Sequence, residues 1–569
     1  MKLLRLTSLL IFAFALITSC KKPFPNQTRY IPKSAAFVAT INTKALQGKL
    51  QKNQAAIENI LKSVNGSDTS VTKGKQEWED LKASGIDLNE NVYLAVVQKG
   101  GGMSMGEGAM ISSGIGTLKD EGKLEAYIQK KQPGSEVKKE KDYSYSTMQG
   151  NKMIAWGKDV VIMMFYQKSF ANQMELDTTT GAYNFKAPVN AAADMKVEMD
   201  SYFNLKEEQS VASIPEFRDL MQDKSDMSMW VNSASSIDNL PLPLPKLKDL
   251  LANSFTAATL NFEDGQITVN SKSYYSKELR DLLNNYTAPD ANLALIENYP
   301  SSNINGFSVF SFNPDFFNGL VNYLEVGAMV DGTLTKMMGS NYTLQEALKA
   351  LKGDIAVVVS DFASDSTRGT RNNIIPKMKM VVNITIGDKV QMNRLLDKVV
   401  EMRLLVKDNT GYHLNPSMQQ TGLRLSVDDK NLLFSTDEST MDQYRAKSGK
   451  AVFKNDVMDE FKGKSLVAYV DLEGILNGVV AENGGDLSKV LPKAKETFKD
   501  VIAYTEKFTG KSVEGHYELR FKNEKENSLT SLLGFIEVAS KNVHWGNMRI
   551  NGQDVMADSP SVAIPVIPR

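Results

Sequence analysis

Short apolar runs that end in asparagine or aspartate recur along the chain, and each leads into a helical pattern. After Asn42 and Asn313, apolar residues return on one face at the helical period of 3.6 residues. Asparagine suits the start of a helix because its side-chain oxygen accepts a hydrogen bond from a free backbone N–H. The pattern predicts four strand–helix units: FVATIN (37–42), MSMWVN (227–232), FSVFSFN (307–313) and SLVAYVD (465–471).

The two halves of the chain resemble each other at an offset of about 270 residues, which predicts an internal duplication. The matching stretches are 81–97 with 348–359, 117–131 with 385–400, 143–164 with 412–435, and ATLNF (258–262) with YELRF (517–521). We expect an extra piece in the first half within 177–210 and a helical one in the second half at 484–510.

The mixture of hairpins and helices favours the α+β class, since tight hairpins join antiparallel strands and not parallel ones. We therefore predict two tandem related domains, residues 30–290 and 291–545, each with helices packed on a largely antiparallel sheet. The proline-rich run at 240–247 predicts a stiff connector, with a proline-recognition ligand as the alternative. Residues 546–569 hold three prolines and no helical period, so we expect an extended tail.

The first 19 residues have the order of a secretory signal: basic residues, a short apolar core, then small residues. The tetrad Ile17-Thr18-Ser19-Cys20 is similar to a bacterial lipobox, in which a lipid is attached to the thiol and the new amino terminus is acylated, as with palmitate. We predict lipidation at Cys20, the single cysteine, and a tether over residues 20–29. The partner is then a membrane, reached through a lipid anchor and without a spanning helix.

The charge balance excludes one class of partner. The chain has 66 basic and 67 acidic residues. Removal of Lys2 and Arg5 with the signal leaves 64 basic and 67 acidic residues, a net charge of −3. Such a balance gives no electrostatic footprint for nucleic acid.

The lipobox, the stretch YIPKSAAFVATIN (30–42) and the doubled layout resemble a family of large uncharacterised envelope lipoproteins of Bacteroides-type Gram-negative bacteria. The resemblance covers nearly the whole mature chain, and its motifs are structural. It implies an envelope location and carries over no functional residue. Surface-exported members often have acidic residues after the cysteine, whereas Lys21, Lys22 and Pro23 stand here. This favours the periplasmic leaflet of the outer membrane over the cell surface.

The glycine-rich stretch at 100–116 invites comparison with a phosphate-binding loop. It lacks the Gly-Lys-Ser/Thr ending of such loops, and its counterpart at 361–377 shares no phosphate-binding residues. A mobile hairpin tip is the better interpretation. Because methionine gives an adaptable apolar surface, Met103, Met105 and Met110 are candidate residues for binding a partner.

Other candidate chemistry is sparse. His413, His516 and His544 lack metal-ligand spacing, so we expect no metal site and no cofactor. The sequence DLNEN (87–91) resembles part of a calcium loop but lacks its glycine, which favours a plain turn. The tryptophans could form a sugar-stacking platform, but Trp156 and Trp230 lie in apolar strands and are expected in the core. Trp545 follows the last repeat element and is the candidate for an exposed binding residue.

We expect a non-enzymatic, lipid-anchored envelope protein that acts as a binding or scaffolding module for an envelope protein or glycan. Two alternatives stay open: an envelope glycan or peptide hydrolase with carboxylates between the two domains, and a carrier of apolar ligands. An enzyme needs paired titratable groups in a cleft, and a carrier needs a sizeable apolar cavity. A binding module needs a broad exposed patch.

Overall fold

The computed structural model describes residues 24–542 with short gaps, and beyond them two short strands, 549–550 and 553–554. The gaps are 66–67, 101–107, 149–150, 169–173, 177–182, 186–190, 237–244, 340–341, 366–374, 420–421, 454–456 and 480–485. No helix within these described residues is long and apolar enough to cross a membrane.

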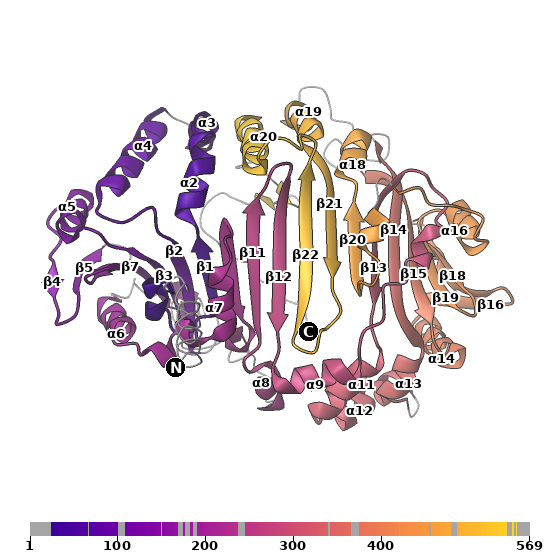
Figure 1. Cartoon of the computed structure of the whole chain (residues 1–569). Helices are drawn as coiled ribbons and strands as arrows, with labels where there is room; N and C mark the ends of the chain where they lie inside the picture. Colours follow the sequence, from indigo (N-terminus) through magenta and orange to yellow (C-terminus); the bar gives the residue numbers. More distant parts are fainter. Residues whose placement is uncertain are drawn as a thin grey trace, which may run out of the picture.

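One antiparallel sheet runs through the whole described body (Figure 1). From one edge to the other its strands are β4 (Lys138–Lys139), β5 (Ser144–Met148), β6 (Lys152–Trp156), β7 (Val160–Lys168), β3 (Gly108–Thr117), β2 (Val92–Gly100), β1 (Phe37–Ile41), β10 (Met227–Asn232), β11 (Phe255–Phe262), β12 (Gln266–Tyr274), β22 (Ser512–Phe521), β21 (Phe498–Thr505), β20 (Leu466–Val470), β13 (Ile304–Ser311), β14 (Leu351–Asp365), β15 (Ile375–Ile386), β19 (Asn431–Ser435) and β18 (Arg424–Val427). The α+β class predicted from the hairpins and helices is therefore confirmed.

The strand order outward from the centre is the same on both sides. It runs β12, β11, β10, β1, β2, β3, β7, β6 on one side and β22, β21, β20, β13, β14, β15, β19, β18 on the other. The halves join through β12 and β22, so residues 30–290 and 291–545 share one sheet and are not two separate bodies. Their common ancestry stays a prediction.

Two details of the predicted repeat are wrong. YELRF lies in β22, whose counterpart by strand order is β12, whereas ATLNF lies in β11. The stretch 484–510 is not all helical, because α19 (Asp486–Thr497) is followed directly by strand β21. ATLNF in β11 and YELRF in β22 share one alternating pattern of apolar residues. Only their positions in the sheet distinguish the two strands.

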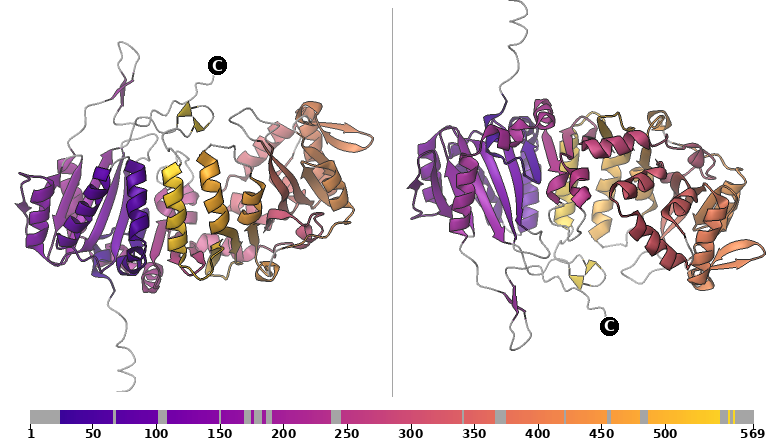
Figure 2. Two further views of the ribbon diagram at one scale, coloured as in Figure 1. Left: turned by 90° about the horizontal axis from the view of Figure 1, so that it is seen from above. Right: turned by 90° about the horizontal axis from the view of Figure 1, so that it is seen from below.

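Helices form rows at the two ends of the central strands (Figure 1). One row holds α2 (Thr43–Gln51), α3 (Gln54–Asn65), α4 (Asp68–Ala83), α20 (Ser528–Asn542), α19 and α18 (Leu472–Gly478), with α5 (Glu121–Lys131) at its outer flank. The other row holds α8 (Pro245–Leu251), α9 (Lys277–Asn285), α11 (Asp315–Tyr323), α12 (Gly327–Met338), α13 (Leu344–Lys349) and α14 (Lys389–Glu401). Seen from above, the yellow helix α20 lies between the indigo α3 and the orange α19 (Figure 2).

The predicted caps are present at Asn42 and Asp471, whereas the cap of α11 is Pro314, one residue after Asn313. The side chain of Asn42 accepts from the N–H of Ala45 (3.1 Å), and that of Asp471 accepts from the N–H of Gly474 (2.9 Å). Asn313 and Asn232 accept from backbone N–H groups two residues further on, at 3.0 and 3.1 Å. These bonds satisfy donors that a helix leaves free at its start, which explains why one sequence pattern marks each strand end.

Two hydrophobic cores lie on one face of the sheet. The first is built around Trp230 and Phe217 under α6 (Ala192–Phe203) and α7 (Pro215–Gln222), and the second around Phe307 and Phe461 beside α10 (Ala294–Glu297), α16 (Glu438–Arg445) and α17 (Val457–Glu460). Trp156 and Trp230 are buried, as their apolar strands predict. Two smaller clusters lie beneath α5 and α14.

The segment expected as a tether is largely docked. Phe24 packs against the first core with the guanidinium of Arg218 over its ring (5.1 Å), and Thr28 is fully buried in the short helix η1 (Asn26–Tyr30). Residues 24–29 therefore belong to the body, because their aromatic and threonine side chains fill the edge of the core. Residues 20–23 lie outside the described part.

The remaining described elements are short: η3 (Glu207–Gln209), η4 (Val211–Ser213), η5 (Ser233–Ser236), α15 (Pro416–Gln419), and the hairpins β8–β9 (Met174–Leu176, Tyr183–Phe185), β16–β17 (Leu405–Asp408, Gly411–Leu414) and β23–β24 (Arg549–Ile550, Gln553–Asp554). Apart from β23 and β24, the tail at 546–569 lies outside the described residues, as does most of the proline-rich run at 240–247.

A buried ion pair beside the central junction should matter for stability. Arg520 on β22 donates twice to Asp500 on β21 (2.6 and 2.8 Å), and the Asp500 side chain is 2 % exposed. Replacing Arg520 with Ala leaves a buried carboxylate alone, so we expect the free energy of unfolding to fall by about 3–5 kcal/mol in urea titrations. The exposed pair Lys277–Asp281 is the control, and D281N should cost less than about 1 kcal/mol. Equal losses in both variants would contradict the assignment.

Candidate functional site

An unbroken row of uncharged side chains crosses the sheet on the face opposite the two large cores. Residues paired across antiparallel strands lie on the same face, so the pairing itself defines the row. In sheet order it is Ser146, Ile154, Met163, Gly114, Leu94, Ala39, Met229, Ala258, Ser271, Gly515, Thr505, Leu466, Phe310, Ile355, Ile384, Leu432 and Val427.

A second uncharged row runs beside it over the central strands: Val92, Ile41, Met227, Leu260, Val269, Tyr517, Ala503, Ala468, Ser308, Val357 and Val382. We call the part of both rows between β2 and β15 the apolar face. Neither row contains an Asp, Glu, Lys or Arg.

The apolar face is covered at its flanks and open at its centre. Ile154 and Leu432, beneath α5 and α14, are 1 % and 8 % exposed. Between them Leu94, Met229 and Phe310 are 43 %, 39 % and 41 % exposed, and the Tyr517 ring of the second row is 44 % exposed. Large apolar side chains that would normally form a core are thus accessible in the part of the chain that the structure describes.

The footprint of the apolar face lies between the largest patch of a typical monomer and one side of a standard protein interface. Strands lie about 4.8 Å apart and residues on one face repeat about every 6.7 Å, so two rows across eleven strands extend about 48 Å and have a footprint of about 640 Å². The largest apolar patch on a typical monomer is about 300–600 Å², whereas a stable interface takes about 800 Å² from each partner. The face is thus somewhat larger than the patch of a typical monomer and smaller than one side of a stable interface.

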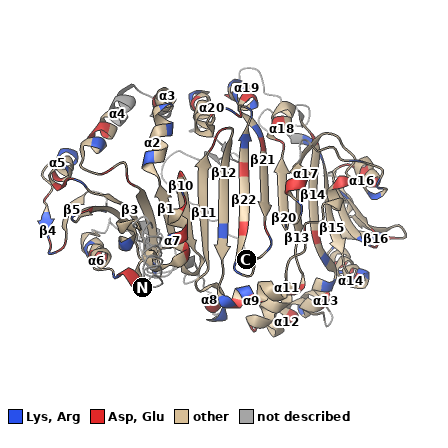
Figure 3. Cartoon of the chain, in the orientation of Figure 1, with Lys and Arg blue, Asp and Glu red and all other residues tan. Residues whose placement is uncertain are grey.

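The opposite face is polar where the halves meet. Asn270 and Lys272 on β12 pair with His516 and Glu514 on β22, between the two large cores, and Figure 3 shows the charged residues along these strands. The His516 ring contacts Asn270 Oδ1 (2.6 Å) and Glu518 Oε1 (2.7 Å). We call these five residues the polar seam.

Two carboxylates lie at the polar seam, where the hydrolase alternative would place them, but they are four residues apart along β22 and each has its own partner. Glu514 pairs with Lys272 (2.7 Å) and Glu518 contacts His516. A general acid requires a carboxyl with a raised pKa. Within the described residues every carboxyl whose pKa departs from its ordinary value is shifted downward, mainly by hydrogen bonds to lysines, to other side chains or to backbone N–H groups: Asp80, Asp87, Asp120, Asp200, Glu346, Asp397, Asp408, Asp429, Asp437, Glu524 and Glu537.

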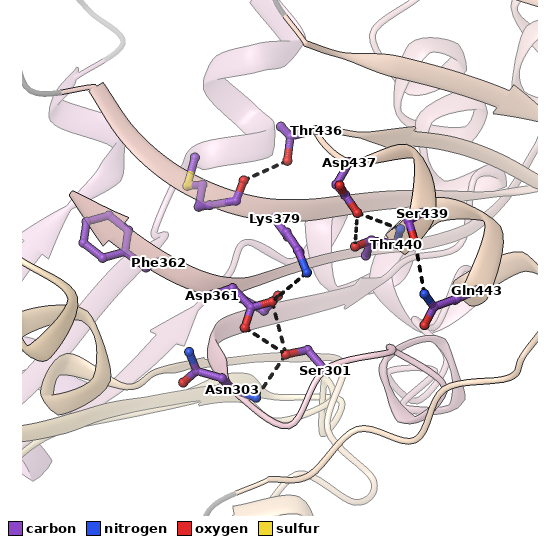
Figure 4. A network of polar contacts seen from close by, with 12 residues as sticks. Ser301, Asn303, Asp361, Phe362, Lys379, Thr436, Asp437, Ser439, Thr440 and Gln443 are labelled. Atoms are coloured by element: carbon purple, nitrogen blue, oxygen red, sulfur yellow. Dashed lines mark hydrogen bonds and ion pairs between the residues drawn. The ribbon is translucent and has the colours of Figure 1, made fainter. Parts of the chain in front are cut away.

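A second polar network lies near the end of β14 (Figure 4). Asp361, in the left-handed backbone region (φ +53°), accepts from Ser301 (3.4 Å) and pairs with Lys379 (3.4 Å). Asp437 starts α16 and accepts from the backbone and hydroxyl of Thr440 (2.8 and 2.5 Å). Both carboxylates are satisfied within the fold, so the network fixes the base of the β14–β15 hairpin.

Two hollows lie at the surface of the described chain. One, of about 490 Å³, opens between α7 and α9 and is lined by side chains of both charges, among them Lys33, Glu216, Arg280 and Lys511. The other, of about 510 Å³, is an open groove between α4 and α5 that contains Trp78 and Tyr127. Neither is the enclosed apolar cavity that the carrier alternative requires.

Of the predicted binding residues, Met110 lies in the part of the chain that the structure describes. The stretch 100–116 forms a hairpin, since Gly100 pairs with Gly108, and Met110 in β3 lies on the same sheet face as Leu94. Met103, Met105, Cys20 and Trp545 lie outside the described residues. The sequence analysis missed the apolar face itself. The sequence did contain a signal for the apolar face. Runs such as FVATI and VYLAVV are apolar at neighbouring positions, and neighbouring residues of a strand point to opposite faces of the sheet.

The remaining candidates take structural roles. Asp87 of the DLNEN stretch pairs with Lys119 (2.8 Å) and accepts from the N–H of Asn89, which makes it part of a turn. His413 contacts Thr410 and Asp408, and His544 lies outside the described residues. Within the described chain no group of three or more His, Cys, Asp or Glu side chains could hold a metal ion.

An α+β protein with one long antiparallel sheet and an open apolar face is the class that this geometry defines. Residues 27–529 match the family described as Domain of unknown function (DUF4836), and the chain belongs to this family. No curated protein matches the chain.

Solved structures of a protein named TP0453 show a weak likeness. Crystal form IV has 10 % identity and a TM-score of 0.23, and covers 44 % of this chain and 80 % of that one. Crystal form III has 10 % identity and a TM-score of 0.24, with 46 % and 87 % covered. Crystal form I has 8 % identity and a TM-score of 0.22, with 45 % and 81 % covered.

The Asp437 cap gives a pH-dependent prediction. The Thr440 hydrogen bond, with Lys379 and Lys377 nearby, lowers the pKa of Asp437 below its ordinary 3.8. A lowered pKa stabilises the fold above the unfolded-state value and ceases to do so as pH falls through the folded value. D437A should therefore cost about 1 kcal/mol at pH 7, and the difference from wild type should shrink below about pH 4. Urea titrations of both proteins, with D442A on the same helix as control, measure this.

Proposed function

We propose that this protein is a lipid-anchored, non-enzymatic binding module of the cell envelope, and that its apolar face docks an uncharged surface of another envelope protein. The observation that carries the proposal is the continuous uncharged row whose central members Leu94, Met229 and Phe310 stay exposed. Folding normally buries such side chains, each worth about 1.5–3 kcal/mol when removed from water. These side chains are already more than half buried, so a partner that covers the face gains the part of this free energy that belongs to the area still exposed.

A protein partner fits the face better than a small apolar ligand. Ligand sites enclose most of the ligand surface in a pocket of about 300–1,000 Å³. The apolar face is instead a pleated surface about 48 Å long, and a fatty acyl chain would leave one side in water. Charged residues are absent from both rows, so a partner that presented charges there would lose their hydration without compensation.

The docked amino-terminal segment supports an orientation for the anchored protein. Phe24 and Tyr30 pack against the first core, which lies on the side of the sheet opposite the apolar face. Cys20 is four residues before Phe24, so an attached lipid would lie within about 14 Å of the body. Anchored in this way, the protein holds the sheet face that carries the two large cores toward the membrane. The apolar face then points toward the envelope space.

The docking proposal is tested by charge substitutions on the apolar face. Met229→Asp and Phe310→Asp each put a carboxylate where a partner must exclude water, so we expect at least about a tenfold loss of partner binding. Asn270→Asp, on the opposite face of β12, is the matched control and should bind normally. Photo-crosslinkers at positions 229, 310 and 270 in cells report the contacts directly. We expect the first two to capture the same protein and the third to miss it.

Two outcomes would overturn the proposal. Equal crosslinking from both faces would remove the apolar face as the site. A concentration-dependent dimer of the purified protein that Met229→Asp abolishes would assign the face to a second copy of the chain.

The anchor is tested separately. Cys20→Ala should abolish labelling by radioactive palmitate and release the protein from the membrane fraction, because one thiol carries the lipid. Labelling that persists in this variant would contradict the anchor while leaving the docking proposal intact.

A further inference from the structure

The open groove between α4 and α5 is lined by aromatic and apolar side chains with charges at its rim. Trp78, Leu81 and Glu77 come from α4, Tyr127 and Lys131 from α5, and Met148 from the end of β5. Tyr127 and Met148 pack against the cluster beneath α5, whereas the Trp78 side chain is 45 % exposed. One wall of the groove is therefore formed by packed side chains, and one indole ring is accessible to solvent.

A buried ion-pair network holds the two helices in register. The Asp80 side chain is 6 % exposed and pairs with Lys130 (2.7 Å) and Lys131 (3.1 Å), while Gln76 donates to it (2.7 Å). The Lys131 ammonium also lies 5.7 Å from the centre of the Tyr127 ring. Because α4 reaches α5 through Asp80, the position of Trp78 relative to Tyr127 is set by the fold.

We propose that this groove binds an uncharged saccharide chain, with a sugar ring stacked on Trp78. A pyranose has one face of C–H groups, which packs on the electron-rich face of an indole, and a rim of hydroxyls that both donate and accept hydrogen bonds. Glu77 supplies an acceptor and Lys131 a donor beside that face. The groove, about 510 Å³ and open to solvent, suits a chain that keeps one side wet.

The charges favour an uncharged chain. Asp80 pairs with both Lys130 and Lys131, so these three side chains together carry one net positive charge. Glu77 at the rim offsets this charge, so neither an acidic nor a basic polymer gains a net attraction there. The site is independent of the apolar face, since α5 covers the flank of the sheet and not its open centre.

The test uses defined sugars and the full mature chain. Chitotetraose and cellotetraose are titrated by calorimetry and by tryptophan fluorescence. Trp156 and Trp230 are buried, so a blue shift on binding that disappears in W78F reports Trp78. We expect W78A to weaken binding at least about tenfold and W78F to retain part of it, because phenylalanine keeps a stacking face. Met329→Ala, exposed on α12, is the control and should bind like wild type.

The outcomes separate a sugar site from a structural or protein-binding role. A melting temperature of W78A equal to wild type keeps the comparison valid, and Y127F serves as a second variant if W78A unfolds. Absence of heat and of a spectral shift with either sugar at millimolar concentration would overturn the proposal. Binding that is unchanged in W78A would do so too. Loss of a protein crosslink in W78A without any sugar binding would assign the groove to a protein partner.

Discussion

Backbone pairing between β12 and β22 is the interaction on which the rest of this structure depends. Nine residue pairs, from Gln266–Arg520 to Tyr274–Ser512, join the last strands of the two halves. Without this ladder each half would end in an exposed strand edge, which readily pairs with other chains. With it, one sheet runs through both halves, and both the apolar face and the polar seam become continuous features. The small residues at the junction fit this role, because a side chain at Gly515 would meet the hydroxyl of Ser271.

The two faces of the sheet differ in what covers them. One side buries the two large cores, and polar residues occupy the seam between them, where neither core reaches. On the other side, among the described residues, α5 and α14 cover the flanks and α18, α19 and α20 contact the central strands, while Leu94, Met229 and Phe310 stay accessible. Folding by itself gains little from the exposed parts of Met229 and Phe310, and the proposed docking role rests on them.

Much of the local structure follows from the sequence. Asn42 and Asp471 cap the helices that their positions predict, and the buried Trp156 and Trp230 lie in strands that read as core. Alternation of apolar residues also located the hairpins. It failed where two strands share one pattern, as with β11 and β22, because a period of two says which side a residue faces and not which neighbour a strand has. The prediction of a tether over residues 20–29 was wrong in part. Phe24 packs beneath the guanidinium of Arg218, a residue far along the chain.

The sequence by itself determined the class of fold, the caps at Asn42 and Asp471 and the core tryptophans, because each depends mainly on neighbouring residues. Tertiary structure alone decided that the halves share a sheet, that Leu94, Met229 and Phe310 fall in one row, and that Trp78 and Tyr127 line one groove. These residues lie far apart along the chain. Only the strand register and the Asp80 ion pairs bring them together, and no local pattern encodes either.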